Sequence, residues 1–135
     1  MQFLDTNILL YSISRHPVES GKRDRAIALL EDDSSAVSVQ VLQEFYVQAT
    51  RSSRVDAIAH ELAVGLIESW TRFPVQEMNL EVLRTALRIR QNYKFSFWDS
   101  AIIAAALTLG CDRIYTEDLS DGQSIDGVKL VNPFQ

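Results

Sequence analysis

The chain contains a single cysteine, Cys111, and two histidines, His16 and His60. One thiol cannot form an internal disulfide, so we expect the protein to reside in a reducing compartment. The histidines have neither the spacing of a zinc site nor that of a catalytic triad, and no histidine is placed to activate Cys111. The sequence therefore argues against a disulfide-stabilised secreted domain, a zinc centre and a cysteine nucleophile.

Long hydrophobic runs are also absent. The longest uncharged apolar stretch extends from Ala101 to Cys111 and is too short to cross a bilayer. The first apolar run is interrupted by Asp5 after four residues, so we expect no signal peptide. The five glycines are scattered and form no phosphate-binding loop. We expect a soluble, cytoplasmic protein with no membrane segment.

Positive charge is scarce, because 13 lysines and arginines face 18 acidic residues and the net charge is −5. This balance argues against nonspecific affinity for nucleic acid, although it does not exclude a nucleic-acid substrate. Most of the basic residues are interpreted as solvated helix faces, but a basic rim can coexist with an acidic centre that binds a cation. The basic residues gather in residues 15–25, 51–54 and 84–94.

The composition is that of an ordinary globular protein, with 47% hydrophobic and 23% charged residues over 135 positions. We expect one domain over residues 1–135 with a sizeable core. Apolar and β-branched runs predict strands, and apolar residues at helical spacing predict helices. The expected strands are 1–4, 35–39, a short one near Val75, one ending at Thr116, and 128–133; the expected helical segments are 7–12, one through 26–30, 41–51, 56–71, 80–92 and 96–110.

Strands and helices therefore alternate along the chain, and we find no tight hairpin between them. This order predicts a three-layer α/β domain, in which a central parallel sheet has helices on both faces. The helix within 96–110 is apolar nearly all round, so it should be buried, and Gly110 should end it.

Four acidic residues occupy informative positions in this scheme. Asp5 directly follows the first strand, and Asp118 follows the strand that ends at Thr116. Asp99 begins the buried helix that leads into that strand, and Glu44 lies in the helix after strand 35–39. Ligands of open parallel sheets bind beyond the carboxyl ends of the strands. The four carboxylates are thus candidates for one site at this edge of the sheet.

Each acid also has a purely structural interpretation. Asp5 fits the N-cap of the following helix, and Asp118 fits an acidic turn. Asp99 fits the last position of a capping box that starts at Ser96, and Glu44 fits a solvated polar stripe with Gln40 and Gln48. Asp99 differs from the others because it lies beside the core, where an unpaired carboxylate is costly.

A convergence of carboxylates has a simple chemical meaning. Close carboxylates repel one another and raise one another's pKa values unless a cation neutralises them. Oxygen ligands favour Mg²⁺ or Mn²⁺, and Mg²⁺ usually takes only one or two carboxylates directly. Such an ion orients water, lowers its pKa and stabilises charge on a phosphodiester. The predicted cofactor is therefore Mg²⁺, with Mn²⁺ as the alternative.

The motifs FLDTNILLY, QEF, FSFWDSAIIAAA and IYTEDL follow one another in this order. Together they resemble the PIN-domain nucleases, and among these the VapC-type toxins of bacterial toxin–antitoxin pairs; the likeness extends from Gln2 to the NPF at 132–134. The resemblance implies four catalytic acids, of which the first and third bind the metal directly. It also implies that two threonines and an asparagine orient these acids through hydrogen bonds. The acids are Asp5, Glu44, Asp99 and Asp118, the direct ligands are Asp5 and Asp99, and the orienting residues are Thr6, Asn7 and Thr116; Glu117 or Asp121 is an alternative for the fourth acid.

This resemblance implies an Mg²⁺-dependent endoribonuclease that cuts tRNA or ribosomal RNA and leaves a 5′-phosphate and a 3′-hydroxyl. It further implies a homodimer and a cognate antitoxin that covers the acidic site. Two other functions stay open: a catalytically silent scaffold that binds a protein or RNA, and another metal-dependent phosphohydrolase. Haloacid-dehalogenase-like phosphatases carry a second acid where this chain has Asn7, and receiver domains need a lysine that IYTEDL lacks. The acids alone do not distinguish RNA from DNA.

Overall fold

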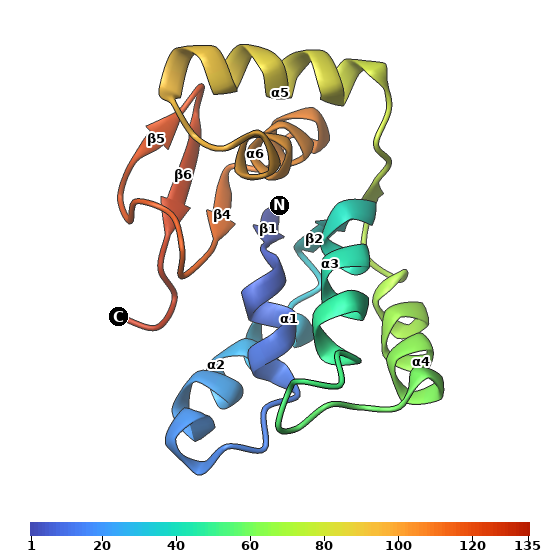
Figure 1. Ribbon diagram of the computed structural model, residues 1–135. Helices are drawn as coiled ribbons and strands as arrows, with labels where there is room; N and C mark the ends of the chain where they lie inside the picture. The colour runs from blue at the N-terminus through green and yellow to red at the C-terminus, as the bar shows by residue number, and fades with distance from the viewer.

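The computed structural model describes residues 1–135, and its centre is a sheet of six strands (Figure 1). The strand order is β3-β2-β1-β4-β6-β5. All neighbouring strands are parallel except β5, which is antiparallel to β6. The strands are β1 (Gln2–Leu4), β2 (Ser35–Ser38), β3 (Val75–Gln76), β4 (Arg113–Tyr115), β5 (Ser124–Ile125) and β6 (Val128–Val131).

Helices cover both faces of the sheet, as the predicted three-layer architecture requires. On one side α6 packs against β2, β3, β4 and β6, and α5 lies over α6; α1, α2, α3 and α4 lie on the other side (Figure 1). The helices are α1 (Thr6–Ser12), α2 (Ser20–Glu31), α3 (Val39–Ala49), α4 (His60–Trp70), α5 (Leu80–Tyr93) and α6 (Phe97–Leu109), with a 3₁₀ helix η1 (Pro17–Glu19) before α2.

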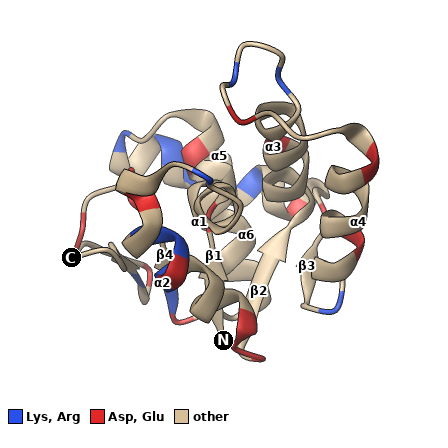
Figure 2. Ribbon diagram, turned by 90° about the horizontal axis from the view of Figure 1, so that it is seen from below, with Lys and Arg blue, Asp and Glu red and all other residues tan.

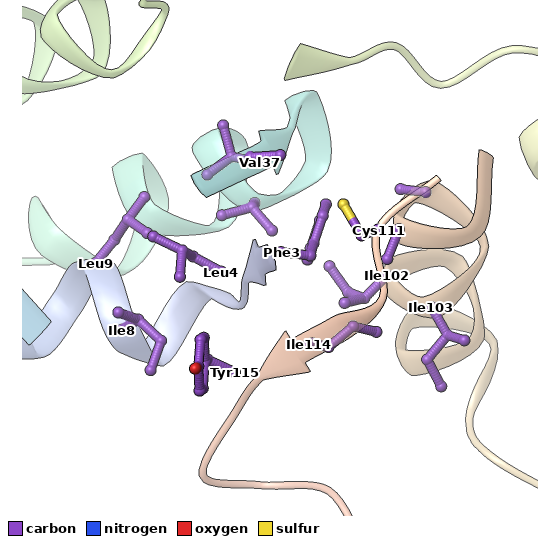
Figure 3. Close-up of a cluster of buried hydrophobic side chains, with 14 of the residues drawn as sticks. Phe3, Leu4, Ile8, Leu9, Val37, Ile102, Ile103, Cys111, Ile114 and Tyr115 are labelled. Carbon is purple, nitrogen blue, oxygen red and sulfur yellow. The ribbon is translucent and has the colours of Figure 1, made fainter. Parts of the chain in front are cut away.

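One continuous core joins the layers. Figure 3 shows side chains of β1, α1, β2, α6 and β4 meeting, among them Phe3, Leu9 and Ile114, all fully buried. The helix α6 is buried almost all round, and it ends at Gly110 in a left-handed conformation with φ 79°. The burial was predicted from its apolar sequence, and the end of the helix was predicted from Gly110. No helix has the length and apolar character needed to cross a membrane.

The register of β1 and β4 brings the residues that follow these two strands to the same edge of the sheet. Leu4 pairs with Tyr115, and the N–H of Asp5 donates to the carbonyl oxygen of Tyr115 at 3.1 Å. Asp5 and Thr116 therefore leave the sheet side by side, at the carboxyl ends of the two central strands. This is the edge at which parallel sheets bind ligands.

Several sequence-based expectations were wrong in detail. A tight hairpin does exist, because β5 and β6 are joined by Asp126 and Gly127, whose φ angles of 51° and 93° match the two-residue turn that an Asp-Gly pair favours. The helix expected from residue 56 begins only at His60, and Asp56 lies in the preceding loop, where it forms an ion pair with Arg54. The last residue of the strand expected over 35–39 belongs instead to α3.

Candidate active site

The four predicted acids line one cleft of about 210 Å³. Asp5 comes from the end of β1, Asp118 from the loop after β4, Glu44 from α3 and Asp99 from the first turn of α6. Figure 2 looks onto the end of the molecule where α1, α3 and α6 lie next to one another. Residues far apart in the sequence therefore share a single concave surface.

Asp5 is the most buried of these acids, with 8% of its surface exposed. It caps α1, and its Oδ1 accepts a hydrogen bond from the N–H of Thr6 at 2.7 Å, while Oδ2 accepts one from the Thr116 hydroxyl at 2.8 Å. Burial raises its pKa from 3.8 to about 6 against the effect of these hydrogen bonds, and the charges of Glu44 and Asp118 act in the same direction as burial. Asp5 is thus the N-cap of α1, as its structural interpretation predicts, but the cap does not offset the cost of ionising its carboxyl group.

Glu44 and Asp118 are held by the side chains that follow Asp5. The Thr6 hydroxyl donates to Glu44 Oε1 at 2.6 Å, and Asn7 Nδ2 donates to Asp118 Oδ2 at 3.0 Å. The predicted hydrogen bonds from Thr6, Asn7 and Thr116 to the acids are therefore confirmed. This arrangement explains why a threonine and an asparagine come directly after the first acid.

The sequence interpretation assigned Gln40 and Gln48 only to a solvated stripe, but Gln48 lines the cleft and Gln40 supports Glu44 from beside it. Gln40 is 7% exposed, and its Nε2 donates to Glu44 Oε2 at 3.3 Å and to the carbonyl oxygen of Trp98 at 3.1 Å. It thereby links α3 to the start of α6. Its position one helical turn before Glu44 was the available signal, since residues four apart share a helix face.

Asp99 is partly buried and occupies the third position of α6. Its N–H donates to the Ser96 hydroxyl at 3.1 Å, so Ser96 caps the helix as the predicted motif implies. The Asp99 carboxylate itself accepts no hydrogen bond from the protein, so the reciprocal half of the capping box is not formed. Asp99 therefore presents a carboxylate without a protein partner to the cleft.

The two alternatives for the fourth acid lie outside the cleft. Glu117 accepts a hydrogen bond from Tyr11 at 2.6 Å and forms an ion pair with Lys22. Although partial burial raises the pKa of Glu117, these two partners outweigh it and hold the pKa below its usual value. Asp121 Oδ1 accepts the N–H of Asn132 at 2.8 Å. Of the three neighbouring acids, Asp118 is the one that faces Asp5.

The donor atoms of the cleft are those that a hard cation prefers. All four acids contribute carboxylate oxygens, and the buried Asn7 Oδ1 has no hydrogen-bond partner. No three carboxylate, histidine or cysteine side chains lie close enough together to hold an ion by themselves. The all-oxygen lining fits an ion that takes one or two carboxylates directly and otherwise keeps its water.

Comparison with protein-family models gives a match to the PIN domain over residues 3–120. This match covers most of the chain and includes all four acids of the cleft. A search of curated protein sequences gives no match.

Solved structures share this fold over nearly the whole chain. A toxin–antitoxin complex from Klebsiella pneumoniae matches with a TM-score of 0.73 and 22% identity, covering 98% of each chain. The FitAcB structure from Neisseria gonorrhoeae matches with a TM-score of 0.70 and 20% identity, covering 99% of each chain. VapC20 of Mycobacterium tuberculosis, a toxin that cleaves the sarcin–ricin loop, matches with a TM-score of 0.68 and 20% identity, covering 87% of this chain and 90% of its own.

Proposed function

Because the chain belongs to the PIN-domain family, we propose that it is a metal-dependent endoribonuclease and the toxin component of a type II toxin–antitoxin pair. One observation carries the proposal: carboxylates from four separate chain segments line one cleft at the carboxyl ends of β1 and β4. A solvated polar stripe, a helix cap and an acidic turn do not require such a convergence.

The proposed cofactor is Mg²⁺, with Mn²⁺ as the alternative, and Asp5 and Asp99 are the proposed direct ligands. Asp5 fits this role because burial and two neighbouring carboxylates raise its pKa to about 6, a cost that a bound cation would offset. Asp99 fits because its carboxylate has no partner in the protein. The all-oxygen donor set agrees with a hard divalent ion.

A bound ion of this kind would supply an activated water and would neutralise charge on the scissile phosphate. The protein's own contribution is to hold the acids in position. Thr116 and the N–H of Thr6 fix both oxygens of Asp5, and the Thr6 hydroxyl fixes Glu44. Asn7 binds only Oδ2 of Asp118, so Oδ1 of this exposed acid is free to accept a proton from water. We propose that all four acids are catalytic residues.

The proposed substrate is tRNA or ribosomal RNA in the cytoplasm, cut to leave a 5′-phosphate and a 3′-hydroxyl. The sarcin–ricin loop cleaved by VapC20 supports this substrate class by similarity of fold. The proposed partners are a cognate antitoxin and a second copy of the chain. The antitoxin is supported by the Klebsiella pneumoniae neighbour, which is a toxin–antitoxin complex.

Cleavage of total cellular RNA by purified, partner-free protein tests this proposal. Discrete fragments with 5′-phosphates are expected with Mg²⁺, and none with EDTA. The variants Asp5→Asn and Asp99→Asn should be inactive. Asp33→Asn is the matched control, because Asp33 is exposed, has no side-chain partner, and lies before β2 at the opposite edge of the sheet. Cleavage that survives EDTA or both site variants would refute the four-acid site, and folded protein that binds Mg²⁺ but cuts no RNA would favour the scaffold function.

A further inference from the structure

The acidic cleft continues into two further hollows on the same side of the molecule. Asn7, Leu10 and Asp118 line both the cleft and a second hollow of about 220 Å³. Arg54 and Glu19 line this second hollow and also a third one of about 470 Å³. The shared walls make the second and third hollows one path leading away from the acids, here called the flanking groove.

The cations of this path lie beyond the acidic cleft, where acids also line the walls. The cleft itself is lined by carboxylates, and the second hollow also contains Glu19 and Glu117, of which Glu117 is paired with Lys22 outside it. The first cation along the groove is Arg54, and the next is Arg15 in the third hollow. The third hollow also contains Glu19 and Asp56, and Asp56 is paired with Arg54, so Arg15 is the cation without an acidic partner. A polyanion that enters the acidic cleft therefore meets cations only in the flanking groove.

The two arginines are held on the same rim by one acid. Asp56 Oδ1 accepts the Nε–H of Arg54 at 2.8 Å, and Asp56 Oδ2 accepts the backbone N–H of Arg15 at 3.5 Å. Asp56 thereby ties the loop after α1 to the loop between α3 and α4, where Figure 2 shows basic segments in blue beside an acidic one in red. Only Nε of Arg54 binds Asp56, so the two terminal nitrogens of Arg54 remain available to bind a ligand. The exposed Arg15 side chain has no ion-pair partner.

The third hollow also has surfaces suited to an unpaired base. His16 caps η1, and its Nδ1 accepts the N–H of Val18 at 3.3 Å, which sets the orientation of the imidazole ring. Pro17 and the fully exposed Val55 add apolar surface beside it. Unpaired RNA bases stack on histidine and aromatic rings, and arginine binds the adjoining phosphates.

We propose that the flanking groove binds the single-stranded RNA segment next to the scissile bond. Arg54 and Arg15 contact backbone phosphates of this segment, and the wall formed by His16, Pro17 and Val55 receives one unpaired base. This assignment rests on the proposed nuclease function, and it makes the base at that position a determinant of where the enzyme cuts.

Binding without cleavage tests the groove independently of catalysis. The affinity for a fluorescein-labelled decauridylate is measured by fluorescence anisotropy in EDTA over a range of salt concentrations. Arg54→Gln and Arg15→Gln should each weaken binding by about tenfold, as expected for loss of a phosphate contact, and should reduce the salt dependence by roughly 0.7 per contact. Arg84→Gln is the matched control, because Arg84 is exposed on α5, on the opposite face of the sheet (Figure 1).

Unchanged affinity of Arg15→Gln would overturn the assignment, and so would an equal loss in Arg84→Gln, which would indicate nonspecific attraction. Arg15→Gln decides the matter if Arg54→Gln fails to fold, because the Arg15 side chain makes no contact that the fold needs. In active protein, sequencing of the fragment ends should show that His16→Ala relaxes the base preference at one position beside the cut. Decauridylate binding that depends on both arginines, combined with no cleavage by the parent protein, would support the groove and contradict the nuclease.

Discussion

Replacement of Asp5 by asparagine is expected to stabilise the metal-free protein at neutral pH while abolishing catalysis. Asp5 is 8% exposed, and burial, reinforced by the charges of Glu44 and Asp118, raises its pKa from 3.8 to about 6. A carboxylic acid whose pKa is higher in the folded state loses folding free energy when it ionises. This loss of folding free energy is absent below pH 3.8, grows as the pH rises from 3.8 to about 6, and is constant above pH 6.

The size of this effect follows from the pKa values. A rise from 3.8 to about 6 corresponds to about 3 kcal/mol at full ionisation, since each pKa unit is worth about 1.4 kcal/mol. Asparagine avoids this cost. However, its amide nitrogen cannot accept the hydrogen bond that the Thr116 hydroxyl donates to Asp5, and the loss of this hydrogen bond costs about 1 kcal/mol. The net stabilisation at pH 7.5 is therefore about 2 kcal/mol, or roughly 6–10 °C in Tm for a domain of this size.

Thermal unfolding of the parent protein and of Asp5→Asn in EDTA, at several pH values between 3 and 8, measures this difference. The variant should be the more stable at pH 7.5, and its advantage should vanish below about pH 4, where Asp5 is protonated in both states. Mg²⁺ should raise the Tm of the parent protein but not that of the variant. A variant that is destabilised equally at pH 4 and pH 7.5 would refute the reasoning, because Asp5 would then act only as a hydrogen-bonded cap.

Three further predictions concern the neighbours of Asp5. Asp99→Asn should lower RNA cleavage by at least about a hundredfold and leave urea unfolding within about 0.5 kcal/mol of the parent, since its carboxylate has no protein partner; a large loss of stability would contradict this. Glu117→Gln removes the partner of Lys22 beside the loop that carries Asp118, so kcat should fall severalfold while stability changes by at most about 1 kcal/mol, and a change confined to KM would contradict it. Ser96→Ala should cost about 1 kcal/mol in urea unfolding through loss of the α6 cap, and an unchanged midpoint would contradict the hydrogen bond.

Much of the fold could be predicted because its signals are local. The buried helix α6 follows from a sequence that is apolar on every side, and its end follows from Gly110, since glycine adopts positive φ without strain. The β5–β6 hairpin was also encoded locally, in Asp126 and Gly127, but this turn was missed because the strands beside it are very short. The extent of the domain over residues 1–135 stays a prediction, as the family match covers 3–120.

The acids of the site and their meeting at one edge of the sheet could be predicted from the sequence, but which donor holds each acid could not. Asp5 follows the first strand directly, so its place at the sheet edge is a local consequence of strand length. Glu44 reaches the cleft from the middle of α3, and nothing in residues near it indicates which side chain it meets. The hydrogen bond from Thr6, 38 positions earlier, exists because α1 packs against α3. The catalytic roles of these acids remain predictions that the variants above test.

The choice between Glu117 and Asp118 illustrates the same division. Both acids follow β4, and their order along the chain does not say which one faces Asp5. Lys22 of α2 and Tyr11 of α1 engage Glu117, and Asn7 engages Asp118. The alternation of strands and helices, the helix caps and the buried apolar runs depend on neighbours within a few residues. These features can therefore be predicted from the sequence. Which carboxylates share a cleft, and which arginines line the path beyond it, depends on packing between distant segments, which no local pattern specifies.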